Sequence, residues 1–465
     1  MPSDPARSAY RPATPILDLA GWLSDEVAPA DFPATQLRFR NQRWAAAVGL
    51  DALSEADWLR HFGRFEALPG TLPVPLALRY HGHQFRVYNP DLGDGRGFLF
   101  AQLRDYDSRL LDLGTKGSGQ TPWSRAGDGR LTLKGGVREI LATEMLEALG
   151  VNTSKTFSIV ETGEQLERGD EPSPTRSAVM TRLSHGHIRI GSFQRLMVLG
   201  EQAKMAALVD YCLAQFLGPP PPADAPAGGE PAVRLMHNVV ERLADLAASW
   251  MVAGFVHGVL NTDNMNISGE SFDYGPWRFL PRWDAGFTAA YFDHQGLYAF
   301  GRQPEALHWN CGQLAIALRT IADAPPLIAA MERFGPLYTE AVARRWCWRL
   351  GVEPQGPQAD GRLVGLCEAA MRKSGEQPDA FFFSHRGGTG AKGELGEVLA
   401  SYRPVGDSHA YWSQGAPETM LIDEVEAIWS AIDRRDDWAP LHDKVARLRR
   451  MGEAHGPAPI PAGHA

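Results

Sequence analysis

The strongest chemical signal in the sequence is a histidine, an asparagine and an aspartate that follow one long helical pattern. His257 precedes Asn264 by seven positions in the segment HGVLNTDN, and Asp273 opens an Asp-Tyr-Gly triplet nine positions later. Amide and carboxylate oxygens suit a hard cation such as Mg²⁺, which also bridges phosphate groups. The spacing therefore predicts a metal-assisted site for a phosphate-bearing substrate, with Asn264 and Asp273 as metal ligands.

The same spacing occurs in the catalytic loop of protein kinases, H-R-D-x-x-x-x-N followed by D-F-G. The sequence departs from that loop at the catalytic base, because Val259 stands where a kinase has its aspartate. Valine cannot accept a proton, and the nearest carboxylate is Asp263. Two interpretations stay open at this point: an inactive kinase-like protein, or a chemistry with a different geometry.

A lysine and a glutamate upstream could complete a phosphate site. Lys116 ends a predicted strand just before a Gly-Ser-Gly stretch, and Glu139 lies in the predicted helix that follows. A lysine in such a place neutralises phosphate charge when a carboxylate holds it in position, as in the lysine–glutamate pair of protein kinases. From the residues alone, a surface lysine near a loop and a solvated glutamate are the more common explanation of any one such pair.

A glycine-rich turn precedes this lysine. It runs from Leu92 to Gly97, contains Gly93, Gly95 and Arg96, and leads into a predicted strand. Glycines let the backbone approach a polyphosphate closely, and an arginine adds a charge-assisted contact. A plain hairpin turn is the more common use of such a segment, so the turn alone does not identify a phosphate loop.

Hydrophobic periodicity predicts the elements that must position these residues. Glycine-ended strands are predicted over 95–105, 109–117 and 155–163, another strand over 177–184, and between them a helix over 133–150 capped by Gly150. Helical patterns cover 194–217 and 234–258 on either side of a proline-rich linker at 218–232, and helices with irregular loops are expected after Arg302. This order predicts an α+β fold with a small strand-rich N-lobe and a larger helical C-lobe.

Composition narrows the class of protein. The chain has 465 residues, 44% of them hydrophobic, which is enough to bury a sizeable core. The net charge of −9 argues against a general nucleic-acid binder. We expect no membrane partner, because no apolar run approaches about 18 residues and the first residues do not form a signal peptide. We expect a reducing cytoplasm as the location, since the four scattered cysteines lack a CxxC pair and are expected to be buried.

Seven motifs occur along the chain in a fixed order: YHGHQF (80–85), LGDGRG (92–97), TKGSGQTPWSRAGDGR (115–130), HIRIGSF (187–193), HGVLNTDNM (257–265), DYGPW (273–277) and FDHQGLYAFGRQP (292–304). Together they resemble the selenoprotein O family of kinase-like AMP transferases, from about Tyr80 to Pro304 and more loosely to the end. The resemblance implies a protein-kinase-like two-lobed fold and transfer of AMP from ATP, with UMP as a possible variant. It also implies Mg²⁺ or Mn²⁺ as cofactor and the Ser, Thr or Tyr hydroxyls of proteins as acceptors.

The resemblance further implies that ATP binds in an orientation opposite to that in kinases, so that pyrophosphate leaves. Lys116 and Glu139 match the supporting ion pair, Asn264 and Asp273 the metal ligands, and Asp263 the proton acceptor. The positions that match ATP contacts are Gly93, Gly95, Arg96, Lys116, Asp128, Gly129, Arg182, Arg189 and Asp273. Arg182 and Arg189 would hold the displaced phosphates. Without the family, both would be interpreted as strand-end arginines in surface salt bridges.

Two alternatives to this function remain. The first is a phosphotransferase, which Val259 disfavours because it replaces the kinase base. The second is a silent nucleotide-binding pseudokinase scaffold, which the intact Lys116, Asn264 and Asp273 disfavour. The resemblance also divides the chain into an N-terminal extension (1–78), an N-lobe with the nucleotide loops (79–190), a helical C-lobe with the catalytic loop and a C-terminal extension (191–455), and a disordered tail (456–465).

The sequence departs from the family at two cysteines. Relatives usually carry a cysteine in the loop before DHQG, where this chain has Ala289, and another near the C-terminus, where this chain has none after Cys367. We therefore expect no control of activity by a disulfide.

Overall fold

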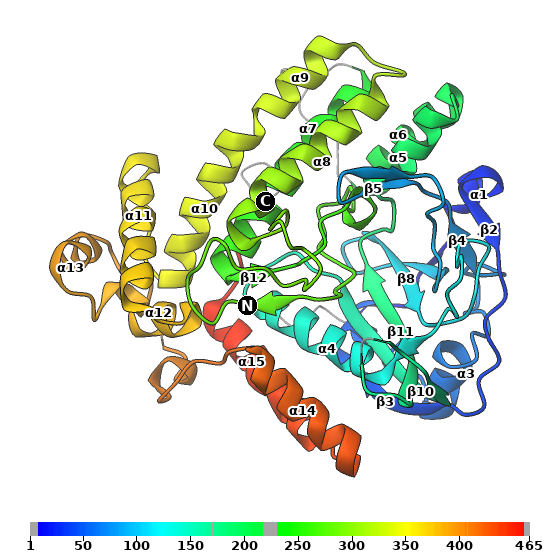
Figure 1. The fold of residues 1–465 in the computed structure, drawn as a ribbon, viewed down its shortest axis with the longest axis horizontal. Helices are drawn as coiled ribbons and strands as arrows, with labels where there is room; N and C mark the ends of the chain where they lie inside the picture. The colour runs from blue at the N-terminus through cyan, green and yellow to red at the C-terminus, as the bar shows by residue number, and fades with distance from the viewer. Residues whose placement is uncertain (1–7, 170, 217–229, 407, 460–465) are drawn as a thin grey trace.

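The chain folds as one large antiparallel sheet followed by a helical region (Figure 1). The computed structural model describes residues 8–169, 171–216, 230–406 and 408–459. The strands of the large sheet are β1 (Pro12–Ala13), β2 (Ser24–Glu26), β3 (Gln36–Arg40), β4 (Leu76–Leu78), β7 (Leu99–Arg104), β8 (Leu110–Lys116), β9 (Leu131–Thr132), β10 (Lys155–Leu166) and β11 (Thr175–Ser184). Their order is β2-β4-β7-β8-β11-β10-β3, with β1 paired to β7 and β9 to β11.

Two short antiparallel pairs lie outside the large sheet. They are β5 (Gly82–Gln84) with β6 (Val87–Asn89), and β12 (Phe255–Val256) with β13 (Arg278–Phe279). The helices are α1 (Leu17–Leu23), α2 (Gln42–Ala47), α3 (Glu55–Phe62), α4 (Leu133–Ala148), α5 (Ile190–Val198), α6 (Gln202–Gln215), α7 (Pro231–Ala253), α8 (Gln303–Leu318), α9 (Ala324–Glu332), α10 (Phe334–Leu350), α11 (Pro357–Ser374), α12 (Pro378–Ser384), α13 (Gly393–Ala400), α14 (Ile422–Arg435) and α15 (Ala439–His455). This mixed architecture confirms the α+β class expected from the sequence.

The two central strands β10 and β11 bury both of their faces. Ile159 and Met180 belong to the core that contains the residues of α4, whereas Val160 and Val179 pack with Trp58 of α3 in a second core. Successive side chains of a strand point to opposite faces of a sheet, so neighbouring residues enter different cores. This double burial explains the short apolar runs Ile159-Val160 in β10 and Ala178-Val179-Met180 in β11.

Helix α4 has well-defined ends. The Thr132 hydroxyl accepts from the backbone N–H of Gly135 at 3.1 Å and so caps the N-terminus. At the other end Gly150 has φ +69°, its N–H donates to the carbonyl of Glu147 at 3.0 Å, and the N–H of Val151 donates to Leu146 at 2.9 Å. These are the two bonds of a Schellman cap, which confirms Gly150 as the predicted C-terminal stop.

Two predicted helices are wrong in their extents. The pattern over 194–217 is two helices, because Gly200 turns the chain with φ +69° between α5 and α6. The pattern over 234–258 ends early, because Gly254 adopts φ +64° and the next two residues pair with β13 as β12. Apolar periodicity continues through both turns, so only the backbone conformation of glycine marks them.

The proline-rich linker predicted at 218–232 lies outside the described residues up to position 229. Pro231 belongs to the first turn of α7, where a missing N–H costs nothing, so the last part of the predicted linker is helix. The predicted tail at 456–465 lies outside the described residues from position 460 onward. The expectation of helices with irregular loops after Arg302 is confirmed by α8 to α15.

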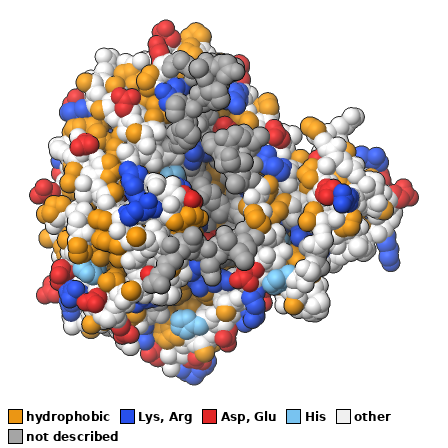
Figure 2. Space-filling model, turned by 180° about the vertical axis from the view of Figure 1, so that it is seen from behind, with side chains coloured by type: hydrophobic (Ala, Val, Ile, Leu, Met, Phe, Trp, Pro, Cys, Tyr) orange, Lys and Arg blue, Asp and Glu red, His pale blue; other side chains and the backbone are white. Residues whose placement is uncertain are grey.

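The C-terminal helices return to the sheet and cover α4 (Figure 1). Arg449 of α15 forms an ion pair with Glu144 of α4 at 2.6 Å, and Lys134 at the start of α4 pairs with Glu426 of α14 at 2.8 Å. Figure 2 shows acidic and basic side chains scattered together over one face of the molecule. Among the described helices, none combines the length and the apolar character needed to cross a bilayer.

Candidate active site

Lys116 and Glu139 form a buried ion pair between the sheet and α4. Lys116 is the last residue of β8, its Nζ contacts the carboxylate of Glu139, and the two residues are 4% and 2% exposed. The same Nζ lies 2.9 Å from Oδ1 of Asp273. Burial of both partners excludes the alternative of a surface lysine and a solvated glutamate.

Asp273 is surrounded by several basic side chains. Its Oδ1 lies 3.6 Å from NH2 of Arg182, in addition to the contact with Lys116. Burial alone would raise the pKa of Asp273, but Lys116, Arg182 and Arg96 hold it well below its ordinary value. The residue also has φ +61°, a left-handed conformation that is uncommon outside glycine and that clusters at functional sites. Asp273 is therefore an ionised carboxylate held in a constrained geometry.

Arg182 of β11 and Arg189, just before α5, are buried rather than exposed at strand ends. Each is 6% exposed. Among the described residues, Nε and NH1 of Arg182 have no hydrogen-bond partner, and neither has Nε of Arg189. Several other arginines of the described chain also have an unpartnered Nε, but Arg182 alone among them has an unpartnered terminal nitrogen, so it retains capacity for a further acceptor such as an anionic ligand.

The second guanidinium is held by three neighbouring groups. Arg189 donates through NH2 to Asp94 at 3.0 Å, and through NH1 to the hydroxyl of Tyr80 at 2.9 Å and the carbonyl of Asp263 at 3.1 Å. The Tyr80 ring lies 4.3 Å from the guanidinium carbon. These contacts attach Arg189 both to the glycine-rich turn and to the segment that carries Asp263.

A short 3₁₀ turn, Thr262–Asn264, presents the expected base and metal ligand. The Thr262 hydroxyl accepts from the N–H of His83 at 2.7 Å and donates to Gln194 at 2.6 Å, which fixes the turn against β5 and α5. The amide nitrogen of Asn264 donates to the carbonyl of Val259 at 3.1 Å. The amide oxygen of Asn264 is therefore the atom that could coordinate a cation.

The carboxylate of Asp263 has one oxygen available to accept a hydrogen bond. Oδ1 is buried and lacks a hydrogen-bond partner among the described residues. Burial raises the pKa of this carboxyl to about 6. His257 does not share this role, because its ring Nε2 contacts the carbonyl of Phe272 at 3.0 Å and burial lowers its pKa. The histidine of the motif thus braces the backbone next to Asp273.

The glycine-rich turn is not a simple hairpin. It follows the β5–β6 pair and enters β7 only at Leu99, later than the predicted start of that strand. A side chain at Gly95 would lie 2.8 Å from the carbonyl oxygen of Trp123, and one at Gly97 would clash with Thr115. The N–H of Gly117 donates to the carbonyl of Arg96 at 2.6 Å, which joins the turn to the residue after Lys116. The glycines therefore permit the close packing of two loops beside the buried cluster.

Asp128 and Gly129 occupy a more exposed loop. The Asp128 carboxylate pairs with Arg168 at 2.8 Å and its side chain is 49% exposed. The carbonyl of Gly129 accepts from the N–H of Gly119 at 3.1 Å. The contacts of Asp128 are thus with neighbouring loop residues rather than with the buried cluster around Asp273.

Several polar residues of the site were not singled out from the sequence. Asp94, inside the glycine-rich turn, anchors Arg189 and also accepts from the N–H of Leu78 at 3.0 Å. Tyr80 and Gln194 act in the same way on Arg189 and on the 3₁₀ turn. The signal for Asp94 was present, since a carboxylate in a glycine-rich turn is a common anchor for a cation. No local pattern marks Gln194, whose partner lies 68 positions away.

The donor set suits a cation that also binds phosphate. No group of three or more His, Cys, Asp or Glu side chains that could hold a metal occurs in the described parts of the chain. A cation held by one or two side chains and by substrate phosphates does not need such a group, and this is the usual arrangement for Mg²⁺. The ionised Asp273, the amide of Asn264 and the unpartnered oxygen of Asp263 are compatible with it.

Comparison with known proteins finds a family model and relatives that align with most of this chain. A sequence model of the family described as protein adenylyltransferase SelO matches residues 8–394. A protein nucleotidyltransferase YdiU of Synechocystis is 40% identical over 473 residues, which cover 95% of this chain and 98% of the relative. The protein of the same name from Gloeobacter violaceus is 41% identical and covers 95% of both chains. A third, from Synechococcus elongatus, is 50% identical over 350 residues, covering 74% of this chain and 68% of its own.

Proposed function

The chain belongs to the SelO family of protein adenylyltransferases, and from this premise we propose that it transfers AMP from ATP to Ser, Thr or Tyr hydroxyls of other proteins. The observation that carries the proposal is a buried cluster of basic side chains. Lys116 and Arg182 lie beside the carboxylate of Asp273, and Arg189 donates to the backbone carbonyl of Asp263. Such a cluster can bind a polyphosphate, and the valine at position 259 removes the base that a kinase would use.

We further propose that the fold is protein-kinase-like. Support comes from the contact of a strand-end lysine with a glutamate on the helix that packs on the sheet, and from the Asp-Tyr-Gly aspartate that contacts the same lysine. In this proposal residues 79–190 form the N-lobe and residues 191–455 the C-lobe with its extension. Residues 1–78 form an N-terminal extension that adds strands β1 to β4 to the N-lobe sheet.

The arginines support a nucleotide that lies opposite to its orientation in kinases. Arg182 and Arg189 would hold the β- and γ-phosphates, since NH2 of Arg182 lies 3.6 Å from Asp273 while each arginine keeps at least one guanidinium nitrogen without a partner among the described residues. Lys116 would neutralise the α-phosphate. The backbone of Gly93, Gly95 and Arg96 would cover the phosphates, while Asp128 and Gly129 would contact the nucleotide from the loop at the rim.

In the reaction the acceptor hydroxyl oxygen bonds to the α-phosphorus, and the bond from that phosphorus to the α,β-bridging oxygen breaks. The bridging oxygen leaves with pyrophosphate, whose charge the two arginines stabilise. The proton of the hydroxyl passes to Asp263, the carboxylate with an oxygen that has no partner among the described residues. Mg²⁺ or Mn²⁺, held by Asn264 and Asp273, would neutralise phosphate charge when bound.

We place this activity in the cytoplasm, where ATP is available and thiols stay reduced. The four cysteines are all free and buried, which suits that compartment. UTP as a donor in place of ATP is the variant of this proposal. No contact of the described site distinguishes the two bases.

The test is incubation of the purified protein and a mixed protein acceptor with ATP and Mg²⁺, followed by intact-mass spectrometry and radiolabelling. Transfer of AMP predicts that label from α-³²P-ATP reaches protein and that label from γ-³²P-ATP does not. Stable γ-label on a hydroxyl residue would restore the phosphotransferase, and no mass change in any acceptor would indicate a nucleotide-binding scaffold. A parallel reaction with UTP decides between AMP and UMP.

A further inference from the structure

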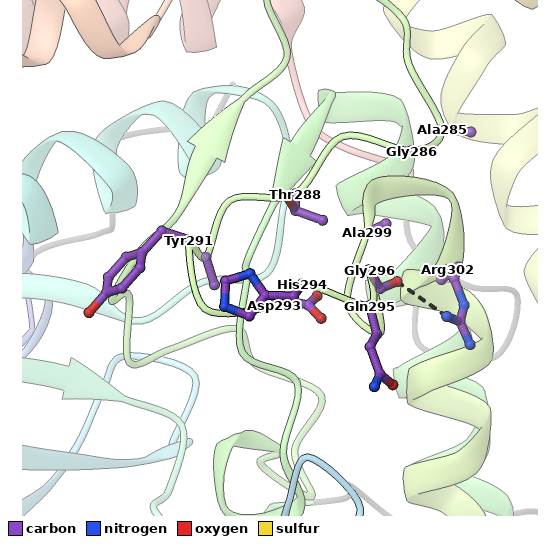
Figure 3. A pocket seen from close by; sticks show the side chains of 11 residues that line it. Ala285, Gly286, Thr288, Tyr291, Asp293, His294, Gln295, Gly296, Ala299 and Arg302 are labelled. Carbon is purple, nitrogen blue, oxygen red and sulfur yellow. Dashed lines mark hydrogen bonds between the residues drawn. The ribbon is translucent and has the colours of Figure 1, made fainter.

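A cavity lies in the loop that precedes α8, outside the buried cluster around Asp273. Its volume is about 560 Å³, within the range of about 300–1,000 Å³ typical of ligand-binding clefts. Figure 3 shows that residues 285–302 line it, with Tyr291 extending away from the loop at one end and Gln295 and Arg302 at the other. None of the roles assigned to the nucleotide site uses these residues.

The loop is rigidly built. The Asp293 carboxylate accepts from the backbone N–H groups of Leu297 and Tyr298, both at 2.8 Å, and NH1 of Arg302 donates to the carbonyl of Gly296 at 3.3 Å. These bonds use the acidic and the basic group of the cavity wall for internal contacts. Arg302 also pairs with Glu305 at 3.3 Å. The carboxylate and the guanidinium of the cavity wall therefore have partners within the loop or in α8, and besides Tyr291, His294 is the remaining ionisable side chain among the lining residues.

The loop is joined to the catalytic segment. The hydroxyl of Tyr298 donates to Asn261, two residues before Asp263, at 2.8 Å. A side chain at Gly258 would lie 3.1 Å from Cβ of Ala289, so the catalytic segment and the cavity loop pack directly on each other. A ligand in the cavity would therefore contact the same loop that packs against the segment carrying Asp263.

Tyr291 lines the cavity, and the neighbouring Phe292, which does not line it, is also exposed. Tyr291 is 77% exposed and Phe292 is 42% exposed, and their rings contact each other with centroids 5.1 Å apart. Phe292 also contacts Phe85, which packs on Tyr298. Exposed aromatic residues beside a cavity are typical anchor points for a protein partner, because a large apolar area is buried with little loss of conformational freedom.

We propose that the 285–302 cavity docks an extended segment of the protein substrate, with a large apolar side chain near the hydroxyl that receives AMP. The proposal rests on the proposed function for the identity of the occupant. Tyr291 and Phe292 bind the apolar side chain, and the packing of the loop on the catalytic segment directs the neighbouring hydroxyl toward Asp263. The site thus selects acceptors by an apolar neighbour rather than by charge.

The test measures binding separately from transfer. A pool of 13-residue peptides, each with one central Ser, Thr or Tyr and random flanks, is passed over the immobilised full chain. The variants are Tyr291→Ala, Phe292→Ala and Tyr291→Phe. Tyr106→Ala is the matched control, since Tyr106 is also exposed but lies at the β7–β8 turn. Wild type and the control should enrich peptides with apolar flanking residues, the two alanine variants should lose at least about fivefold of this enrichment, and Tyr291→Phe should keep it.

Equal enrichment on all five proteins, or no enrichment on the wild type, overturns the proposal. Labelling of the enriched peptides from α-³²P-ATP then tests the proposed function separately. Peptides that bind through Tyr291 but are never labelled would leave the docking site intact and contradict the transfer of AMP. In the labelling assay, the KM for peptide should rise in Tyr291→Ala, while the KM for ATP stays within about twofold of the wild type.

Discussion

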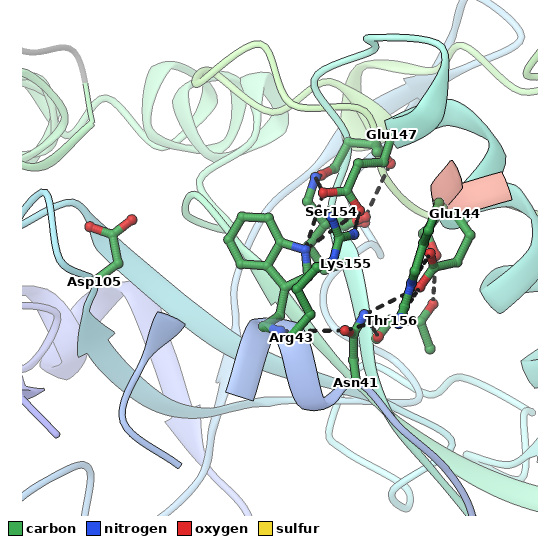
Figure 4. A network of polar contacts seen from close by, with 12 residues as sticks. Asn41, Arg43, Asp105, Glu144, Glu147, Ser154, Lys155 and Thr156 are labelled. Carbon is green, nitrogen blue, oxygen red and sulfur yellow. Dashed lines mark hydrogen bonds and ion pairs between the residues drawn. The ribbon is translucent and has the colours of Figure 1, made fainter. Parts of the chain in front are cut away.

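Two charged regions of the protein share helix α4 and differ in how their charges are satisfied. In the first, where α4 meets residues of α2 and α15, the Glu144 carboxylate accepts from Arg449 at 2.6 and 2.9 Å, and Glu147 accepts from Arg43 at 2.6 Å and from Trp44 at 3.2 Å (Figure 4). We call these residues the α4 network. Its carboxylates are saturated by close donors.

The second region is the buried cluster of charged side chains around Asp273, where we propose that phosphate binds. Arg182 approaches the nearest carboxylate oxygen only to 3.6 Å, and two of its nitrogens have no partner among the described residues. Oδ1 of Asp263 is likewise buried without a partner. The α4 network leaves only Nε of Arg43 without a partner in the described part of the chain, whereas the cluster around Asp273 leaves a carboxylate oxygen and two nitrogens of one guanidinium unpaired. We therefore propose that the middle of α4, through Glu139, serves binding and that its C-terminal end serves folding.

The largest expected effect is loss of transfer in Asp273→Ala and in Lys116→Ala. Both groups act on phosphate charge, and removal of such a contact costs about 3 kcal/mol or more of transition-state stabilisation, at least about 100-fold in kcat. Label transfer from α-³²P-ATP measures the rate, and circular dichroism measures folding.

The matched control is Asp105→Asn. Asp105 is fully buried and accepts from Arg109 at 2.8 Å, but it lies at the β7–β8 turn. It should lower stability without lowering the rate per folded molecule. Near-normal transfer by Asp273→Ala with Mg²⁺ present would rule out the assignment of this residue to the metal and phosphate site.

The next effect concerns the orientation of the nucleotide. Arg182→Ala and Arg189→Ala should each lower kcat by roughly 100-fold, because the pyrophosphate leaving group loses a positive contact. Arg176→Ala is the control for Arg182, since Arg176 lies on the same strand but pairs with Glu161 and Asp436 at 2.7 Å. A wild-type rate of transfer in Arg182→Ala would contradict this prediction and would show that Arg182 has a structural role.

The α4 network should respond in the opposite way. Glu144→Gln removes the negative charge opposite Arg449, and breaking one partner of a buried ion pair costs about 3 kcal/mol. We expect a lower guanidinium midpoint and an unchanged rate per folded molecule. The double variant Glu144→Met/Arg449→Met should recover part of the loss, because the two charges are removed together. A rate that falls with Glu144→Gln while stability holds would contradict the division of α4.

The sequence predicted the parts of this structure that depend on local pattern. The central strands, α4 and its C-terminal glycine follow from runs of apolar residues and from the conformation of Gly150. The ends of α5 and α7 could not be predicted in this way. The chain turns at Gly200 and Gly254, but the apolar periodicity of the sequence continues past both glycines.

The site was predicted unevenly for a similar reason. Lys116 and Glu139 lie at positions set by a strand end and the helix after it, and the structure brings them together. Tyr80 and Gln194 reach their partners across 109 and 68 positions of sequence, which no local motif encodes. The roles of all these residues in binding and transfer stay predictions until the variants are measured.

A smaller effect is expected from Glu270, a buried carboxyl near the site. Burial raises its pKa from 4.5 to about 7, and its Oε2 accepts from the N–H of His185 at 2.8 Å. The folded state thus binds a proton that the unfolded state releases above pH 4.5, so stability falls as the pH rises toward 7. Between pH 5 and pH 7 this amounts to roughly 2 kcal/mol.

Glu270→Gln keeps the acceptor for His185 and cannot ionise. Its thermal midpoint relative to the wild type should therefore rise steadily from pH 5 to pH 7. The measurement is differential scanning calorimetry of both proteins across this range. A constant difference between the two midpoints would show that Glu270 has an ordinary pKa in the folded protein.

The smallest expected effect is that of redox conditions on transfer. Cys212, Cys311, Cys347 and Cys367 are all free and buried, and burial raises the pKa of each thiol, to about 12 for Cys367. The thiolate is the reactive form, so these thiols should resist oxidation. Ala289, which the sequence resemblance puts in place of a family cysteine, is buried.

Cys347 and Cys367 are the pair to examine, because both lie in the core between α10 and α11. Activity should therefore change by less than about twofold between dithiothreitol and oxidised glutathione, since a buried thiol is shielded from both reagents. A reversible, several-fold activation by dithiothreitol that disappears in Cys347→Ala would show that this core pair forms a regulatory disulfide. The same activation in the variant would point to Cys212 or Cys311 instead. Without activation in either protein, none of the four thiols controls transfer under these conditions.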